Sequence, residues 1–318
     1  LGFSIASYTG VGYPNSTTGT VGHGLDSAPE LVIIKGIGGT GQSGGAGSWV
    51  VGSSLLGNGW DGSMYFNSTG AYSNAINYFW NGAVTSDVIN LKNDWFVNGA
   101  NNNYIAYSFT SKPGFSKVGT YTGNGSTNGT IVQTGFEPAF LMIKRTDASG
   151  ASWLIVDNKR VGTANEKHEL FANTSSAESS SGYDIAFLSN GFQLQTTTSN
   201  ANTNGGSYIY LAFAADGSTA TPSLANSFAT EIYTGNAGAS NTTSQSITSV
   251  GFKPDLIWIK NRDNANNNVL FDSVKGVTNW LNSNNTNQQY SNSYTDASFL
   301  SNGFTTGRSD QTNRNSND

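Results

Sequence analysis

The protein has 318 residues, of which 36% are hydrophobic, 12% aromatic and only 11% charged, with a net charge of -5 at pH 7 and no cysteine. The length suits two or three domains of about 100 to 200 residues, and the aromatic content excludes a disordered chain. The acidic balance leaves no basic face for nucleic acid, and without cysteine there are neither disulfides nor thiolate metal sites.

The polar but uncharged composition is typical of an extracellular or virion β protein. No apolar run approaches the roughly 18 residues of a membrane span, so we expect no membrane insertion. The chain begins at Leu1 with neither an initiator Met nor a signal peptide. We therefore expect a processed chain or a portion of a longer one.

A Tyr-Thr-Gly triplet recurs at Tyr8, Tyr121 and Tyr233, at intervals of 113 and 112 residues. Solenoid repeats span only about 20 to 50 residues, so each unit is predicted to be a whole domain with its own core. The predicted modules are residues 1–114, which diverge most, 115–222 and 223–318. Short linkers at 110–114 and 216–222 should join them into a semi-rigid string.

Each unit contains a proline six positions before a lysine, with almost only apolar residues between: Pro29 and Lys35, Pro138 and Lys144, Pro254 and Lys260. Proline is tolerated at the first position of a strand, and an unbroken apolar run predicts a strand buried on both faces. A simple antiparallel sandwich would leave one face of such a strand exposed to solvent. We therefore expect the outer face, carrying either Ile257 and Ile259 or Leu256 and Trp258, to be covered by a loop, a neighbouring module or another subunit.

Further strands complete the unit. The return runs at 49–51, 153–156 and 269–271 favour strands, and the identical FLSNGF sequences at 187–192 and 299–304 predict Asn-Gly hairpins. The first unit has LKNDWF at 91–96 in place of that hairpin. The residues 163–166, TANE, match a capping box for one helical turn; otherwise we predict an all-β chain of three tandem antiparallel β-sandwiches.

The first two units close with an apolar strand, YIAYSF at 104–109 and YIYLAF at 208–213. The third unit stops at Asp318 without this strand, which would leave an open sheet edge. We therefore expect that the chain continues or that another chain supplies the strand.

Two glycine-rich stretches match short motifs of cofactor-binding and catalytic sites. GIGGTG at 36–41 fits a dinucleotide-binding pattern, but more glycine follows where a helix is needed, so a loop without cofactor is the better interpretation. GQSGG at 41–45 fits a serine nucleophile pattern, but His23 and His168 lie in different units.

The acidic residues do not predict an active site. No strand carries the two alternating carboxylates of a glycosidase, and a solvated turn explains Glu166 and Glu169 beside His168. The Asp/Asn-rich residues 263–268 lack the spacing of a calcium loop, so no metal is expected. We predict no enzyme activity.

Two charged pairs follow the return strands, Asp157 with Arg160 and Asp272 with Lys275. We expect these charges to pair across the hairpin with Lys144 and Lys260. Such a contact at the rim of the sheet would be worth at most about 1 kcal/mol.

Several aromatic residues lie in polar loops: Tyr13, Trp60, Tyr72 and Tyr290. They could stack on sugar rings, as in lectins, or serve as core residues or subunit contacts. Trp60, Tyr72 and Tyr290 are the candidate binding residues.

The sequences GFKPDLIWIKNR at 251–262, LFDSVKG at 270–276 and FLSNGF resemble a tandem module of structural proteins of marine bacteriophages, especially those infecting cyanobacteria. The resemblance is close over 252–304, moderate over 136–213, and confined in the first unit to 29–35 and 104–109. It implies concanavalin A-like jelly rolls and a place on the virion surface, and it carries over no catalytic residues.

We therefore expect a non-enzymatic virion structural protein, part of a tail fibre, spike or capsid-surface appendage. It would act in assembly and host adhesion, associating with copies of itself and other virion proteins, without cofactor. The alternative is a glycan-binding, lectin-like surface module of a phage or bacterium. A polysaccharide depolymerase is disfavoured for want of paired acids.

Overall fold

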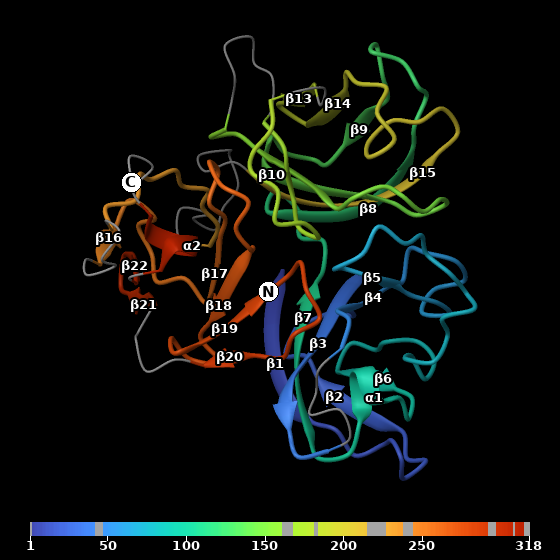
Figure 1. Ribbon diagram of the computed structural model, residues 1–318. Helices are drawn as coiled ribbons and strands as arrows, with labels where there is room; N and C mark the ends of the chain where they lie inside the picture. The colour runs from blue at the N-terminus through green and yellow to red at the C-terminus, as the bar shows by residue number, and fades with distance from the viewer. Residues whose placement is uncertain are drawn as a thin grey trace.

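The computed structural model describes residues 2–41, 47–160, 168–180, 184–214, 227–237, 244–291, 297–307 and 309–314. The described chain is built almost entirely from antiparallel strands (Figure 1), and its two helices, α1 Trp95–Asn98 and α2 Asp310–Asn313, are single turns. The predicted all-β sandwich class is confirmed. The capping box at 163–166 and the linker at 216–222 lie outside the described residues. The first, second and third repeats below are residues 1–114, 115–222 and 223–318.

Each repeat contributes a larger and a smaller sheet. In the first repeat the larger sheet contains, in order, β1 Phe3–Thr9, β7 Asn102–Phe109, β3 Leu31–Gly39, β4 Val50–Ser53 and β5 Met64–Tyr65. The smaller sheet contains β2 Gly19–Gly22 and β6 Val88–Leu91. In the second they are β8 Ser116–Thr122, β15 Ser207–Ala214, β10 Pro138–Arg145, β11 Leu154–Asp157 and β12 Leu170–Phe171, with β9 Ile131–Gln133, β14 Gly191–Leu194 and β13 Ile185–Leu188. In the third they are β17 Leu256–Ile259, β18 Val269–Asp272, β19 Asn279–Asn282 and β20 Tyr290–Ser291, with β16 Gln245–Ile247, β22 Gly303–Thr306 and β21 Ala297–Leu300. The larger sheets of the first two repeats thus share one strand order, and β17, β18 and β19 follow the order of β3, β4 and β5.

The proline-led strands are apolar on both faces, as the sequence predicted. In β17, Ile257 and Ile259 point into the core of their own repeat, whereas Leu256 and Trp258 pack on the opposite face. Successive residues of a strand point to opposite faces, so a run without polar residues must be covered twice. Both covers are present in this chain.

The second cover is a core shared by all three repeats. Its buried members include Leu31, Trp49, Phe66, Tyr107, Met142, Trp153, Phe213, Leu270 and Leu281. The expected string of separate beads is therefore replaced by three lobes packed around a common centre (Figure 1). Burying apolar surface contributes about 25 cal/mol per Å², which favours this closed packing over exposed strand faces.

Backbone hydrogen bonds connect the repeats in a closed cycle. The N–H groups of Tyr72, Glu178 and Gln289 donate to the carbonyl oxygens of Thr146 (3.0 Å), Arg262 (2.8 Å) and Ile37 (3.3 Å), respectively. The first repeat thus contacts the second, the second the third, and the third the first. Each acceptor lies two residues after a repeat lysine, so the three contacts are equivalent.

The FLSNGF sequences form the predicted hairpins, with Phe187 opposite Phe192 and Phe299 opposite Phe304. In the first repeat, residues 91–96 take the place of this hairpin. Leu91 ends β6, which pairs with β2. Asp94 then accepts the Phe96 N–H at 2.8 Å and starts α1, because a carboxylate at the N-cap satisfies a free helix donor.

The described part of the third repeat holds no counterpart of β7 or β15. In the first two repeats the central strand, β7 or β15, pairs on both sides. Among the described residues, β17 pairs with β18 alone.

Candidate functional site

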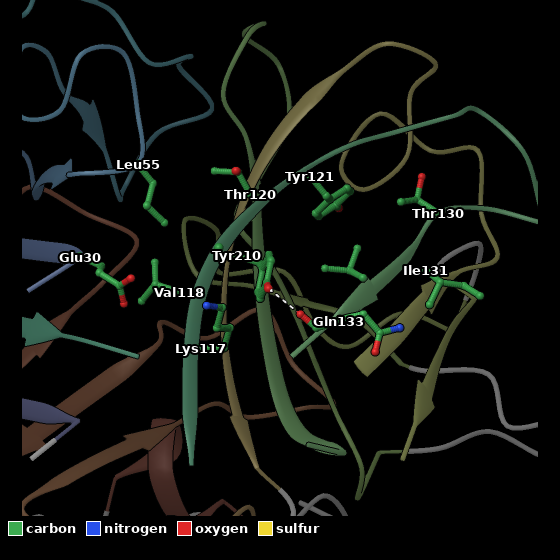
Figure 2. A pocket seen from close by; sticks show the side chains of 12 residues that line it. Glu30, Leu55, Lys117, Val118, Thr120, Tyr121, Thr130, Ile131, Gln133 and Tyr210 are labelled. Atoms are coloured by element: carbon green, nitrogen blue, oxygen red, sulfur yellow. Dashed lines mark hydrogen bonds between the residues drawn. The ribbon is translucent and has the colours of Figure 1, made fainter. Parts of the chain in front are cut away.

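A shallow groove of about 480 Å³ lies where the first repeat meets the second (Figure 2). Glu30 and Leu55 of the first repeat form one side, and β8, β9 and Tyr210 of the second repeat form the rest. Further lining residues include Lys117, Val118, Thr120, Thr130, Ile131 and Gln133. None of these residues was identified from the sequence, because the groove exists only where two repeats pack together.

The groove combines apolar and polar surface. Leu55 and Ile131 are 39% and 53% exposed, and Tyr210 donates its hydroxyl to the Gln133 carbonyl at 3.4 Å. Burial, together with the charge of Glu30, raises the Tyr210 pKa to about 12, so the phenol stays protonated at neutral pH. A few polar groups beside apolar side chains are what a small polar ligand requires.

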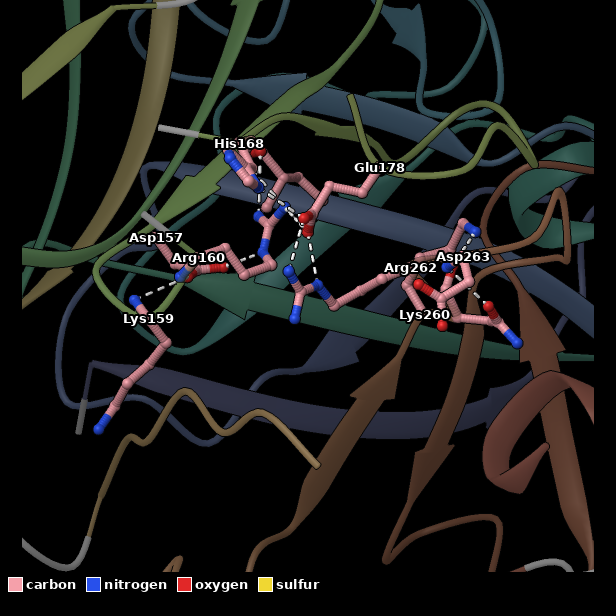
Figure 3. A network of polar contacts seen from close by, with 10 residues as sticks. Asp157, Lys159, Arg160, His168, Glu178, Lys260, Arg262 and Asp263 are labelled. Atoms are coloured by element: carbon pink, nitrogen blue, oxygen red, sulfur yellow. Dashed lines mark hydrogen bonds and ion pairs between the residues drawn. The ribbon is translucent and has the colours of Figure 1, made fainter. Parts of the chain in front are cut away.

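A cluster of charges, the Glu178 cluster, joins the second repeat to the third (Figure 3). Arg262 donates to Glu178 through Nε (2.7 Å, to Oε2) and Nη2 (2.6 Å, to Oε1). His168 Nδ1 lies 2.7 Å from Oε1, and Arg160 Nη1 donates to Oε2 at 3.3 Å. Arg160 is also held by Asp157, whose Oδ2 accepts from its Nε at 2.6 Å.

The pKa values in this cluster indicate a structural role. Burial raises the Glu178 pKa, but hydrogen bonds from Arg262 and His168 and the nearby positive charges outweigh it and lower the pKa to about 2. Glu178 is thus ionised at neutral pH and unsuited to donate a proton. The nearby Glu169 is only 2% exposed, so the solvated turn expected there is wrong: its N–H and carbonyl both pair with Ser179. Burial raises its pKa.

The repeat lysines do not pair with Asp157 or Asp272, contrary to expectation. Lys144 Nζ donates to the carbonyls of Arg145 and Ala151, both at 2.9 Å, and to Thr69 of the first repeat at 3.4 Å. Lys35 donates in the same way to Gly47 (2.9 Å) and to Thr286 of the third repeat (3.2 Å), and Lys260 to Asn264 (3.1 Å). Backbone carbonyls therefore satisfy these ammonium groups. Burial lowers the pKa to about 7 for Lys35 and about 8 for Lys144 and Lys260.

Asp272 and Lys275 form an ion pair with each other, and their side chains are 0% and 1% exposed. Tyr107 of the first repeat donates its hydroxyl to Asp272 at 2.7 Å, and Lys275 donates to that hydroxyl at 3.2 Å. The expected surface rim is therefore a buried contact between the third and first repeats. Charges buried in this way must be paired, and the shared core brings them together.

The candidate aromatic residues occupy different environments. Trp60 is 6% exposed and packs edge-on against Trp80 at 5.1 Å between ring centroids, so of the alternatives that the sequence left open it is a core residue. Tyr72 packs against the shared core, and its hydroxyl donates to Asp61. Tyr290 is half-buried and stacks on Trp280 at 5.4 Å. The structure brings none of the three together.

Other sequence patterns carry no site. Residues 36–39 of GIGGTG continue β3 and pair with β7 instead of opening a helix, while 42–45 lie outside the described residues. Within the described ranges no group of three or more His, Cys, Asp or Glu could hold a metal ion. No helix there is long and apolar enough to cross a membrane.

A family model described as a domain of unknown function (DUF7483) matches residues 1–216 and 223–318. No curated protein and no solved structure matches the chain.

Proposed function

The chain belongs to the DUF7483 family, and we propose that it is a non-enzymatic structural protein of a virion surface. It would form part of a tail fibre, spike or capsid appendage and act in assembly and host-surface adhesion. The place on a virion is suggested by the resemblance of 251–304 to modules of marine phage structural proteins. The buried charges support the structural role independently of that resemblance.

One observation carries the structural role: buried charged groups are used to join repeats. Glu178 binds Arg262 of the third repeat, Asp272 binds Tyr107 of the first, and Lys144 binds the Thr69 carbonyl of the first. An active site needs groups that are accessible and poised to exchange protons. Here these groups hold the three repeats together.

The proposed partners are copies of this protein, other virion proteins and host glycans. The apolar strand faces, which favoured self-association in the sequence, are largely covered inside the chain. Association would therefore use other surfaces.

Antibodies against the purified protein test the location. Applied to intact particles of the virus that encodes the chain, they should label the surface in electron micrographs. Pre-immune serum on the same particles is the control. Absence from purified particles, with the protein recovered in the cell lysate, would refute the virion role.

The groove favours a second function, binding of host glycans. Leu55 and Ile131 offer apolar contact, and Lys117, Thr130 and Gln133 offer hydrogen bonds beside it. Among the described residues that line the groove, Glu30 is the one carboxylate, where a glycosidase uses two, so a depolymerase remains disfavoured.

A glycan array with the purified protein tests this binding. Ile131→Asp should weaken any detected binding about tenfold or more, which corresponds to about 1.4 kcal/mol. Val274→Asp is the matched control, because Val274 is an exposed aliphatic residue of the third repeat. Equal loss in both variants, or no binding to any glycan, would exclude the groove as a lectin site.

A further inference from the structure

Asp272 ends β18 and Lys275 follows three residues later, and we propose that these two side chains condense to an amide. The product is a covalent bond between Asp272 Cγ and Lys275 Nζ, formed without a cofactor or a second protein. The inference rests on the contacts of this buried pair and does not depend on a location in a virion.

The two side chains are closed off from solvent. Those of Asp272 and Lys275 are 0% and 1% exposed, and Lys275 Nζ contacts Asp272 Oδ2 directly. Burial lowers the pKa of Lys275 to about 7, so the uncharged amine, which is the nucleophilic form, is readily reached at neutral pH. Two buried charges are costly to keep out of water, and the amide replaces both with neutral groups.

The backbone after β18 brings the two side chains to the same side. The Gly276 N–H donates to the Asp272 carbonyl at 3.1 Å, which closes one helix-like turn. Residues three apart in such a turn are neighbours on its surface. The aspartate carbon and the lysine nitrogen can therefore bond without displacing the strand.

The two carboxylate oxygens of Asp272 have different partners, as condensation requires. Oδ1 accepts the backbone N–H groups of Val274 (3.2 Å) and Lys275 (2.8 Å). Donors placed in this way stabilise the negative charge that develops on a carbonyl oxygen under attack. Oδ2 accepts the Tyr107 hydroxyl at 2.7 Å, and Lys275 Nζ donates to that hydroxyl at 3.2 Å. Oδ1 is thus placed to remain as the amide oxygen and Oδ2 to leave as water.

The reaction balances within these side chains. A proton moves from Lys275 Nζ to Asp272 Oδ2, directly or through the Tyr107 hydroxyl, which gives a neutral amine beside a carboxylic acid. The amine lone pair then forms the Nζ–Cγ bond while the Cγ–Oδ2 bond breaks. Oδ2 leaves as water with the acid proton and one amine proton, and the other amine proton stays on the amide nitrogen. A site closed to solvent also disfavours the reverse hydrolysis.

The other repeats each lack a reactant at the equivalent positions. Asp157 occupies the place of Asp272, and its Oδ1 likewise accepts the Arg160 N–H, at 2.9 Å. Arg160 takes the place of Lys275, and its guanidinium stays protonated in proteins, so it is no nucleophile. In the first repeat Ser53 holds the place of the aspartate. We therefore expect the amide in the third repeat, with the second repeat as an unreactive pair of the same arrangement.

Mass spectrometry of the intact, denatured protein tests the proposal. After incubation of the folded protein at neutral pH, we expect a mass lower than that of the sequence by one water molecule. Lys275→Arg keeps the positive charge and reproduces the pair of the second repeat, so this variant should have the full mass of its sequence. A wild-type protein at the full mass of its sequence would overturn the proposal.

Digestion with trypsin locates the bond. Trypsin cleaves after free lysine and arginine, and the chain holds neither residue between Lys275 and Arg308. We expect a peptide of residues 263–308 that is uncut after Lys275 and lighter by one water molecule, while cleavage after Arg160 is complete. Cleavage after Lys275 as complete as after Arg160 would overturn the proposal even if a water molecule is missing, because the loss would then come from a succinimide.

Tyr107→Phe tests the path of the proton. Protein made by cell-free synthesis is sampled at intervals, and the linked fraction should rise at least about tenfold more slowly in this variant than in the wild type. Tyr78→Phe is the control, at a tyrosine of the same repeat that is 58% exposed, and should match the wild type. Equal rates in all three proteins would overturn the role of Tyr107. The wild-type mass decides the proposal even where a variant folds poorly.

Discussion

Arg262 binds Glu178 with two parallel hydrogen bonds, Nε to Oε2 at 2.7 Å and Nη2 to Oε1 at 2.6 Å. The two residues are 84 positions apart and belong to different repeats. Bidentate pairs of this kind are among the stronger polar contacts in proteins. The same carboxylate also binds Arg160 and His168, so it fixes the boundary between the second and third repeats.

Glu178→Gln should lower the free energy of unfolding by about 3 kcal/mol, because it leaves Arg160, which is 5% exposed, without a charged partner on that side. Urea denaturation at neutral pH measures the change. Glu137→Gln is the matched control, since Glu137 is an exposed residue of the same repeat. A shift no larger than that of the control would show that the cluster contributes little.

Acid should weaken the same boundary. The Glu178 pKa is lowered from 4.5 to about 2 in the folded protein, so its contribution to stability is present above pH 4.5 and is lost as the pH falls towards 2. Denaturation of the wild type and Glu178→Gln at several pH values between 2 and 6 measures the difference in slope. We expect the two curves to converge at the acid end, and parallel curves would contradict the assignment.

Alkali should stabilise the fold through the buried lysines. The Lys144 pKa is lowered from 10.5 to about 8. Between these values the unfolded chain binds a proton that the folded one has lost, so the free energy of unfolding rises with pH. Lys144→Met should flatten this rise by up to about 1.4 kcal/mol per pH unit.

The control for this experiment is Lys159→Met, which changes an exposed lysine of the same repeat. Urea denaturation from pH 7 to 10 compares the three proteins. If Lys144→Met retains the slope of the wild type, the lysine is not the titrating group.

Trp153→Phe should loosen the contact between the second and first repeats. The Trp153 indole Nε1 donates to the Tyr65 carbonyl at 3.1 Å, and Trp49 makes the equivalent bond to Asn282 of the third repeat at 3.2 Å. Loss of one buried bond costs about 1 to 3 kcal/mol. Both Trp153→Phe and Trp49→Phe should therefore lower the urea midpoint to a similar extent.

Trp80→Phe is the comparison for these two variants, because its indole bonds Ser63 of the same repeat at 2.7 Å and its ring lies outside the shared core. It should leave exchange protection of the other repeats unchanged. Strongly unequal effects of Trp49→Phe and Trp153→Phe would argue against equivalent contacts around the cycle.

Local patterns were enough to predict the strands and hairpins. The apolar run before Lys144 and the Asn-Gly turn at 190–191 specify elements through their nearest neighbours in sequence. The sequence also indicated that Leu256 and Trp258, or their neighbours, needed a second cover. In the first repeat LKNDWF at 91–96 takes the place of the hairpin, and Asp94 caps a helical turn there.

The sequence by itself determined an all-β chain whose repeated strands are too apolar to remain uncovered. Only the tertiary structure decided that the repeats cover one another, that Asp272 meets Tyr107, and that Trp60 is buried. The physical reason is the distance along the sequence between the residues that determine each feature. A strand's periodicity is set by adjacent residues, whereas the partner of a buried charge or of an apolar face is chosen by packing between segments far apart in the sequence.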